Sequence, residues 1–276
     1  MLVEYYGVED NFCEWAYIHG VIDHLDLDDS TKLHIVSVTP EWDYTKKVIL
    51  NNECKNVIFA LADEWGKDNI PQSWKDNATV FKAYLKPEQE KGSVHSFPLG
   101  FNKKHIKLPN KPVKSRQTDV FFAGHMSSKN RRHYLRWVIE YFQEMKPSKR
   151  PKLDFNITRG FNLGLTGEEY SQKLHDAKIV VCPAGNVSME TFRHYEAMRS
   201  GAVVVSPKLP QTKIYKDAAI CQVDDWEDNV GDTIMDLLSD IDMLQLVQER
   251  QQQTYNNRFT AKSVAKYINE LLSDTK

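Results

Sequence analysis

The sequence has little cysteine and no excess of basic charge. Its 276 residues include four cysteines far apart in the chain, with no C-x-x-C pair: Cys13, Cys54, Cys182 and Cys221. This spacing disfavours a disulfide framework or a zinc site, so buried free thiols are expected. The 36 Lys and Arg residues against 38 Asp and Glu give a formal net charge of -2. A nucleic-acid partner is therefore not expected, because proteins that bind the phosphate backbone normally show a clustered basic excess.

The sequence also lacks a long hydrophobic run. No stretch approaches the roughly 18 consecutive apolar residues that a membrane-spanning helix needs. The beginning of the chain, MLVEYYGVEDNF, has no basic segment followed by an apolar one, as a secretory signal would. We therefore expect a cytoplasmic protein without a membrane span, or a soluble portion of a longer one.

Short apolar runs alternate with helix-length segments along the whole chain, which has 41% hydrophobic and 27% charged residues. This alternation predicts an α/β fold with parallel sheets covered by helices. The strands expected in the first part are 2–6, 34–38, 57–61, 80–85 and 94–99, with a helix over 12–25. Those expected in the second part are 119–123, 153–157, 179–182, 202–206 and 219–223, with helices over 131–145, 168–176 and 189–199, and from 226 onwards.

A basic segment with prolines, Phe101 to Gln117, interrupts the alternation and is interpreted as a linker. The sequence thus predicts two Rossmann-like, doubly wound domains facing a cleft, with ligands beyond the carboxyl ends of the strands. The expected boundaries are 1–105 for an N-terminal domain and 115–255 for a C-terminal domain. A C-terminal helix over 256–276 is expected to pack back on the first domain.

The most informative segment is Ile179 to Ser206, IVVCPAGNVSMETFRHYEAMRSGAVVVS. It predicts a buried strand, a loop with Pro183 and Gly185, a helix with Ser188 as its N-cap, and a second strand after Gly201. Glu196 lies on the apolar face of this helix, and Arg193 is three residues before it. A carboxylate there suits ribose hydroxyls, and the helix N-terminus suits a diphosphate. The alternative is that Arg193 and Glu196 form only a surface ion pair.

The pattern S-x-x-x-x-R-x-x-E-A-x-x-x-G-x-V, from Ser188 to Val203, resembles the nucleotide-sugar site of GT-B glycosyltransferases, most closely the exostosin-like family. Three further pieces resemble that family in the same order: Asp63-Glu64-Trp65-Gly66 after VIFALA, FPLGF at 97–101, and FFAGHMSSKNRRHYL at 121–135. The sequence departs from the family pattern at Ala62, where a histidine is common, and at Ala184 and Glu190.

The resemblance implies an inverting enzyme that transfers a sugar, with xylose or galactose favoured, from a UDP-sugar to a hydroxyl of a glycan acceptor. No tightly bound cofactor or metal is implied. The implied donor-binding residues are Gly124, Arg131, Arg132, Arg159, Ser188, Glu190, Arg193 and Glu196. Many retaining enzymes of this fold resemble one another in a pair of glutamates, of which the first would fall at Ser188, so its absence favours inversion. Inversion needs a general base, for which Asp63 is the candidate, followed by Glu64 and Asp43.

Several alternatives stay open. The enzyme could be a retaining transferase or a nucleotide-sugar epimerase, or the protein could bind sugar nucleotides or glycans without catalysis. Arg131 and Arg132 could be ordinary solvated residues, Asp63 a turn residue, and His125 a loop residue. The triplets Asp26-Leu27-Asp28 and Asp240-Ile241-Asp242 resemble metal-binding Asp-x-Asp motifs, but neither follows a predicted buried strand. Three glycosylation sequons occur, and the one at Asn186 lies inside the proposed nucleotide loop, which favours a compartment without N-glycosylation.

Overall fold

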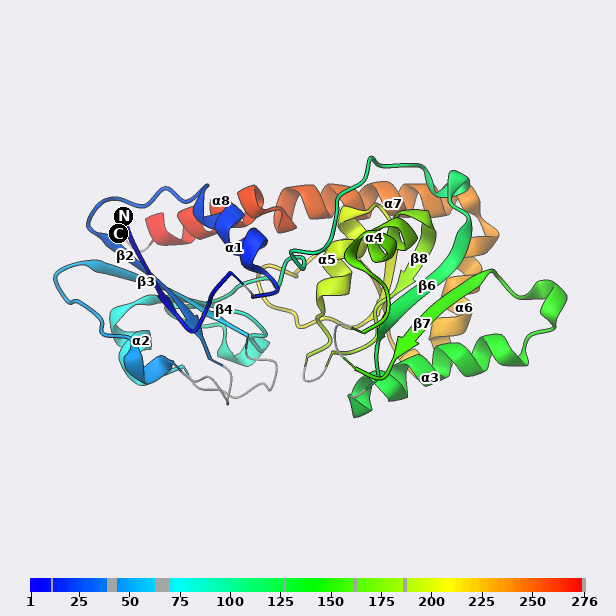
Figure 1. Ribbon diagram of the computed structural model, residues 1–276, viewed down its shortest axis with the longest axis horizontal. Coiled ribbons are helices and arrows are strands. Elements are labelled where there is room, and N and C mark those ends of the chain that lie inside the picture. The colour runs from blue at the N-terminus through cyan, green and yellow to red at the C-terminus, as the bar shows by residue number, and fades with distance from the viewer. Residues whose placement is uncertain are drawn as a thin grey trace. The chain divides into compact units, whose positions relative to one another are not determined.

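A computed structural model describes residues 1–10, 12–38, 44–62, 70–126, 128–160, 163–185 and 188–274. The chain divides into two compact units (Figure 1). Unit 1 comprises Met1–Lys103, Pro210–Lys216 and Arg258–Lys276, and unit 2 comprises Lys104–Leu209 and Asp217–Asn257. Within the described ranges, none of the helices combines the length and the apolar composition needed to cross a membrane.

Unit 1 is built on a five-stranded parallel sheet in the order β1-β2-β3-β4-β5. The strands are β1 (Leu2–Tyr6), β2 (Thr31–Ser37), β3 (Lys55–Leu61), β4 (Thr79–Lys82) and β5 (Val94–Ser96). Helices cover both faces, which is why the central strands are continuous apolar runs. Trp74 of α2 (Gln72–Asn77) packs against Ile58 and Val80 on one face. On the other, α1 (Trp15–Ile22) places Tyr17 against Phe97, which in turn contacts Phe59.

The end of the chain belongs to unit 1. Helix α8 (Ala261–Ser273) packs on α1, where Gly20 approaches Ala261 so closely that a Cβ on residue 20 would lie 3.1 Å from that of Ala261. Tyr17 donates a hydrogen bond to the carbonyl oxygen of Phe259 (3.0 Å), and Lys55 Nζ donates to that of Leu272 (2.8 Å). These bonds fasten the last helix to the sheet of the first hundred residues.

Unit 2 has a second parallel sheet, in the order β10-β9-β8-β6-β7. Its strands are β6 (Thr118–His125), β7 (Leu153–Thr158), β8 (Ala177–Val181), β9 (Val203–Pro207) and β10 (Cys221–Val223). Helices α3 (Lys129–Glu144) and α6 (Trp226–Ser239) contribute Leu135, Val138 and Ile234 to the core on one face. On the other face α4 (Gly167–Asp176) places Tyr170 against Phe121. This is the predicted α/β architecture, with two parallel sheets enclosed by helices.

The order of strands in unit 2 reverses at β6, which lies between β7 and β8 although it precedes both in the chain. In open parallel sheets, ligands bind outside the carboxyl ends of the strands at such a reversal. The ends that meet there are Gly124–His125 of β6 and Val181 of β8, after which the chain leads to α5 (Phe192–Arg199). The remaining long helix, α7 (Ile241–Thr254), fastens β9 through Gln251, whose side chain pairs with both backbone groups of Val204.

The basic segment expected to be a linker is bonded to unit 2 from residue 104 onwards. Arg116, buried at 3% exposure, donates to the carbonyl oxygens of Leu174 (3.2 Å), Ala177 (2.9 Å) and Ser200 (2.8 Å). His105 contacts Arg199 Nη1 through Nδ1 (2.7 Å) and Ser200 Oγ through Nε2 (3.0 Å). Arg116 therefore holds backbone carbonyls at the ends of α4 and α5, the groups that a helix end leaves without partners.

Candidate donor site

Arg193, in the first turn of α5, reaches across to β6. Its Nε donates to the carbonyl oxygen of Ala123 (3.0 Å), and Nη2 donates to the same oxygen. The guanidinium carbon lies 4.5 Å from the centre of the Phe122 ring, in a cation–π arrangement. A Cβ on residue 124 would lie 2.6 Å from Nη2, so glycine is required there for this approach. Gly124 and Arg193, both predicted site residues, are thus in direct contact.

One nitrogen of Arg193 has no partner among the residues that the structure describes. The side chain is 8% exposed, yet Nη1 is buried and makes no hydrogen bond to any residue of the described ranges. Guanidinium keeps its charge in proteins, so this is a buried charged donor without an acceptor. Buried polar groups are nearly always paired, and an exception calls for a ligand or a functional explanation. An anion at the carboxyl end of β6 would supply the missing acceptor.

Arg131 joins the two loops that border the carboxyl end of β6. It is 8% exposed, and it donates from Nη1 to the carbonyl oxygen of His125 (3.0 Å) and from Nε to that of Ala184 (3.3 Å). Ser128, the N-cap of α3, donates to the carbonyl oxygen of Gly185 (3.2 Å). The interpretation of Arg131 as an ordinary solvated residue is therefore wrong, because its guanidinium is buried between the loop after β6 and the loop after β8.

Positive charge gathers around the end of β6. Burial, together with the positive charges of Arg131 and Arg193, lowers the pKa of His125 below its usual value. The last residue of β6 is therefore neutral at neutral pH and lies beside two guanidinium groups. Such an arrangement attracts an anionic ligand.

The loop after β8 is closed on itself. Gly185 N donates to the carbonyl oxygen of Ser188 (2.7 Å), and a Cβ on Gly185 would lie 2.9 Å from that oxygen. Ser188 Oγ accepts from the backbone N–H of Glu190 (3.2 Å). The prediction that Ser188 is the helix N-cap is wrong, because the bond from Glu190 shapes the loop and α5 begins only at Phe192.

A threonine–histidine pair starts α5 instead. Thr191 has the extended backbone of an N-cap residue, and its N–H donates to Nδ1 of His194 (3.2 Å). With Nδ1 accepting, Nε2 donates to Ser206 Oγ of β9 (2.8 Å). Burial lowers the pKa of His194 to about 3, so the ring is neutral over the physiological range. Sequence reasoning missed this pair, although Thr followed three residues later by a side chain able to accept a hydrogen bond resembles a capping box.

Two tyrosines hold the glutamates of the site, Tyr195 buried and Tyr170 half-buried. Tyr195, at 1% exposure, donates to Oε1 of Glu190, which is itself 2% exposed. Tyr170 of α4 donates to Oε2 of Glu196 at 2.8 Å, and Glu196 is 4% exposed. Burial and the negative charge of Glu196 raise the pKa of Tyr170 well above its usual value. The alternative of a surface Arg193–Glu196 ion pair is wrong, because both side chains are buried and bonded to other groups.

The remaining predicted residues lie at the margin of the site or outside the described ranges. Arg132 is exposed and donates to the carbonyl oxygen of Met126 (2.6 Å). Arg159 is exposed in the turn after β7, and β7 pairs with β6 up to Thr158 and His125. Asp63, with Glu64 and Asp43, lies outside the described residues of unit 1. The residue before Asp63 is described: Ala62 follows β3 with a φ of 62°, a left-handed conformation that non-glycine residues rarely adopt.

The Asp-x-Asp triplets serve local structure. Asp28 accepts from the hydroxyls of Ser30 and Thr31 (2.7 Å each), and Asp240 is the N-cap of α7. In the part of the chain that the structure describes, no group of three or more His, Cys, Asp or Glu side chains is placed to hold a metal ion.

No protein-family model matches the sequence, and no curated protein matches it. Solved structures do. An α-glucosyltransferase in complex with UDP has a TM-score of 0.53 and 10% identity, over 94% of this chain and 84% of that one. The sucrose-phosphate synthase of Thermosynechococcus elongatus has a TM-score of 0.54 and 12% identity, over 88% of this chain and 73% of that one. HepE of Anabaena in complex with UDP has a TM-score of 0.51 and 11% identity, over 94% of this chain and 82% of that one.

The chain has the GT-B fold. The fold predicted from the sequence is thereby confirmed. At 10–12% identity the likeness concerns the fold, so the activity has to be argued from the chemistry of the site.

Proposed function

We propose that this protein is a glycosyltransferase that takes a UDP-sugar as its donor. The observation that carries the proposal is the buried, unpaired Nη1 of Arg193 beside Gly124, at the strand reversal of unit 2 in a GT-B fold. Two of the similar structures, the α-glucosyltransferase and HepE, are complexes with UDP. A diphosphate oxygen is an acceptor of the right charge for the guanidinium.

Residues from several elements would bind the donor together. The diphosphate is assigned to Arg193 and the start of α5, with Gly124 leaving room and Arg131 holding the two bordering loops. A charge-assisted hydrogen bond contributes about 1.5–3 kcal/mol, more than the ~0.3–1 kcal/mol of an exposed helix N-terminus. Arg193 is therefore expected to dominate the affinity for the diphosphate.

The two glutamates receive different assignments. Glu196, oriented by Tyr170, is assigned to the ribose hydroxyls. Glu190 would repel a neighbouring diphosphate unless it contacts sugar hydroxyls or points away. Its bond with Tyr195 favours a role in fixing the loop that Ser188 also shapes. Arg132 and Arg159, both exposed, are assigned to the margin of the donor, with Arg159 on the uracil side.

For the chemistry we propose inversion without a bound metal. The acceptor hydroxyl gives its proton to the carboxylate of Asp63, its oxygen bonds to the anomeric carbon, and the bond from that carbon to the diphosphate breaks. UDP then leaves with the negative charge facing Arg193. Ser188 supports inversion, because it offers no carboxylate for a double displacement. The left-handed Ala62 supports a functional position for Asp63, because strained backbone tends to occur at active sites.

The finer identity follows the resemblance of the motifs. We propose an exostosin-like transferase that acts on a glycan acceptor, with xylose or galactose as the favoured donor sugars. The proposed division of labour places the acceptor on the N-terminal domain, 1–105, and the donor on 115–255.

Calorimetric titration with UDP tests the donor assignment. UDP should bind the intact chain, and Arg193→Ala should weaken it at least tenfold, since the loss of one charge-assisted bond exceeds about 1.4 kcal/mol. Arg136→Ala is the matched control, because Arg136 is an exposed residue of α3 whose guanidinium pairs with Glu140 and lies over the Trp137 ring. Unchanged UDP affinity in Arg193→Ala would remove the basis of the proposal.

Release of UDP from UDP-xylose, UDP-galactose and UDP-glucose, with and without glycans, then tests catalysis. The anomeric configuration of the product, read by NMR, distinguishes inversion from retention. A changed donor sugar without any acceptor would indicate an epimerase. UDP binding with no turnover of any donor would indicate a binding protein.

A further inference from the structure

Three aromatic side chains of unit 1 contact one another at its surface: Tyr5 of β1 and Trp15 and His19 of α1. The ring centres of Trp15 and His19 are 4.2 Å apart, and Tyr5 lies 5.5 Å from Trp15 and 5.8 Å from His19. Tyr5 is 39% exposed, and Trp15 and His19 are half-buried. We call these three residues the aromatic platform.

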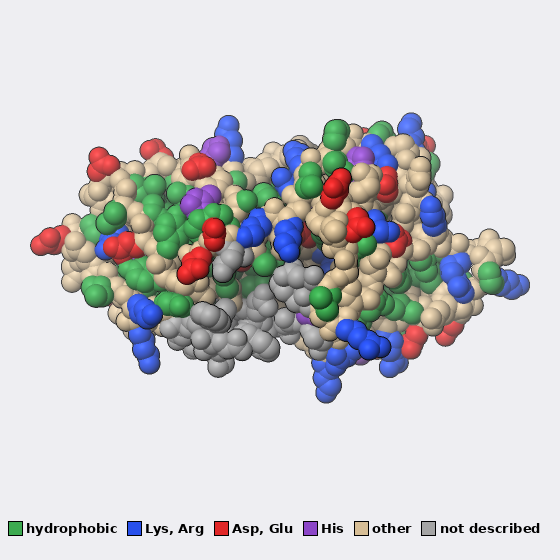
Figure 2. Space-filling model, viewed as in Figure 1, with side chains coloured by type: hydrophobic (Ala, Val, Ile, Leu, Met, Phe, Trp, Pro, Cys, Tyr) green, Lys and Arg blue, Asp and Glu red, His purple; other side chains and the backbone are tan. Residues whose placement is uncertain are grey.

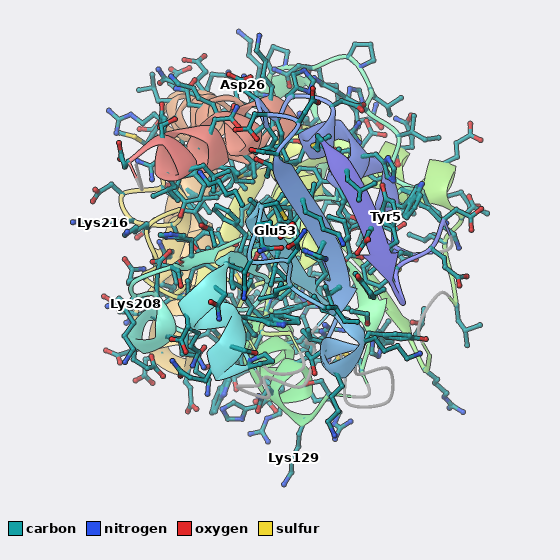
Figure 3. All side chains as sticks on the ribbon, turned by 90° about the vertical axis from the view of Figure 1, so that its left-hand side faces the viewer. Tyr5, Asp26, Glu53, Lys129, Lys208 and Lys216 are labelled. Carbon is teal, nitrogen blue, oxygen red and sulfur yellow. The ribbon has the colours of Figure 1, made fainter. Side chains whose placement is uncertain are left out.

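The platform lies near the carboxyl end of an edge strand. Tyr5 is the penultimate residue of β1, and Trp15 is the first residue of the helix that follows it. Figure 3 shows Tyr5 on β1, and Figure 2 shows hydrophobic and histidine side chains gathered on the surface over β1 and α1. Aromatic side chains together with a few polar groups are a common lining of ligand-binding sites.

Polar atoms surround the rings. The Tyr5 hydroxyl meets His19 Nε2 at 3.3 Å. Burial raises the pKa of Tyr5, and the negative charge of nearby Asp23 raises it further. Asp23 is the exposed C-cap residue of α1. The surroundings therefore combine aromatic rings with a hydroxyl, an imidazole and a carboxylate. A negative charge beside the rings is unfavourable for a nucleic acid or an anionic lipid surface.

This combination matches one ligand chemistry. A pyranose ring has an apolar face of C–H groups that stacks on an aromatic ring, and a rim of hydroxyls that bond to carboxylate, hydroxyl and imidazole groups. We propose that the aromatic platform binds a pyranose unit of the glycan acceptor, which gives the enzyme a carbohydrate subsite formed by Trp15, Tyr5 and His19. The inference rests on the proposed function for the identification of that glycan as the acceptor.

NMR of the tryptophan side chains tests the proposal directly. The indole N–H signal of Trp15, assigned by its absence in Trp15→Phe, is followed while cellohexaose, maltoheptaose and chitohexaose are titrated separately. At least one of them should shift the signal. Tyr5→Ala should weaken that binding about tenfold, the upper end of what an aromatic contact contributes. Tyr5→Phe, which keeps the ring, should weaken it less.

Leu2→Ala is the matched control, because Leu2 is a 57% exposed residue of the same strand whose side chain alternates to the other face. It should leave the carbohydrate affinity unchanged. The proposal is overturned if no oligosaccharide shifts the Trp15 signal, or if Tyr5→Ala and Leu2→Ala behave alike. It is also overturned if sedimentation shows that Tyr5→Ala dissociates a dimer, since the platform would then be a contact between two copies.

UDP titration of the same samples separates the two proposals. UDP binding without any carbohydrate shift would remove the platform and keep the donor site. A carbohydrate shift without UDP binding would keep the platform as a glycan site and remove the transferase.

Discussion

The hydroxyl of Tyr170 on α4 donates a 2.8 Å hydrogen bond to the carboxylate of Glu196 on α5. Glu196 is buried and Tyr170 is half-buried, so the bond fixes the carboxylate in one orientation with little competition from water. The glutamate that the motif supplies is therefore positioned by a residue 26 positions earlier in the chain, in a different helix.

Tyr170→Phe should lower the discrimination between UDP and 2′-deoxy-UDP. The variant keeps the ring against Phe121 and removes only the bond to Glu196. The variant keeps Glu196 and only loosens its orientation, so the loss of binding free energy should not exceed the ~1.5 kcal/mol of one hydrogen bond to a charged group. We therefore expect the affinity for UDP to fall about three- to tenfold. The affinity for 2′-deoxy-UDP should change less. Calorimetry with both nucleotides checks this, and an equal loss for the two would separate Tyr170 from ribose recognition.

Gly124→Ala should weaken UDP binding through Arg193. The new Cβ would lie 2.6 Å from Nη2 of Arg193, and the guanidinium can move only by lengthening its bonds to Ala123. Steric changes of this kind in packed sites cost about 1–3 kcal/mol. A double-mutant cycle by calorimetry is decisive. In the Arg193→Ala background, Gly124→Ala should have little further effect on UDP affinity, whereas additive losses would mean that glycine acts independently of Arg193.

Asp63→Asn should abolish sugar transfer and leave the affinity for UDP within about twofold. The amide cannot accept the proton of the acceptor hydroxyl, while the donor residues belong to unit 2. Ala62→Gly is the informative companion variant. Glycine adopts the φ of 62° without steric cost, so we expect stability to stay equal or to rise by about 1 kcal/mol. Substantial turnover in Asp63→Asn would assign the base to another residue.

The strands were the most predictable part of this protein. Runs such as Val57–Leu61 and Ile179–Val181 are apolar on both faces, and only a strand covered on both sides explains them. Arg193 and Glu196 were chosen as candidates from the sequence because of their spacing in one motif, and Gly124 because of its place in FFAGH. The fold was predictable because the local sequence patterns agree with the tertiary contacts that the structure shows.

The partners of these residues could not be predicted in the same way. Tyr170 and Tyr195 look like ordinary helical tyrosines, and only the packing of α4 on α5 and the turn after Glu190 show what they hold. The start of α5 was misplaced because Ser188 is a better N-cap residue by preference than the Thr191–His194 pair. His194 prevails through its bond to Ser206 on β9, which local propensity does not contain.

The neutral state of His194 leads to a pH dependence of stability. Its folded pKa of about 3 lies below the usual value of 6.5, so the unfolded chain binds a proton between these limits that the folded chain does not. The stabilising contribution of His194 to the free energy of unfolding is therefore complete above about pH 6.5, and it is lost as the pH falls from there toward about 3. The loss approaches ~1.4 kcal/mol per pH unit for each such histidine. His105, with a folded pKa also of about 3, adds a second contribution of the same sign.

His194→Gln isolates the first of these contributions. Urea unfolding at pH 8, 6 and 5 should show a constant cost from the altered bonds to Thr191 and Ser206 at pH 8. Between pH 6 and pH 5, the free energy of unfolding of the variant should fall by about 1 kcal/mol less than that of the intact chain. The carboxylates of the protein are common to both chains and cancel in this difference. Parallel pH profiles would mean that the imidazole takes up a proton in the folded protein, and the Thr191 N–H would then have to find another acceptor.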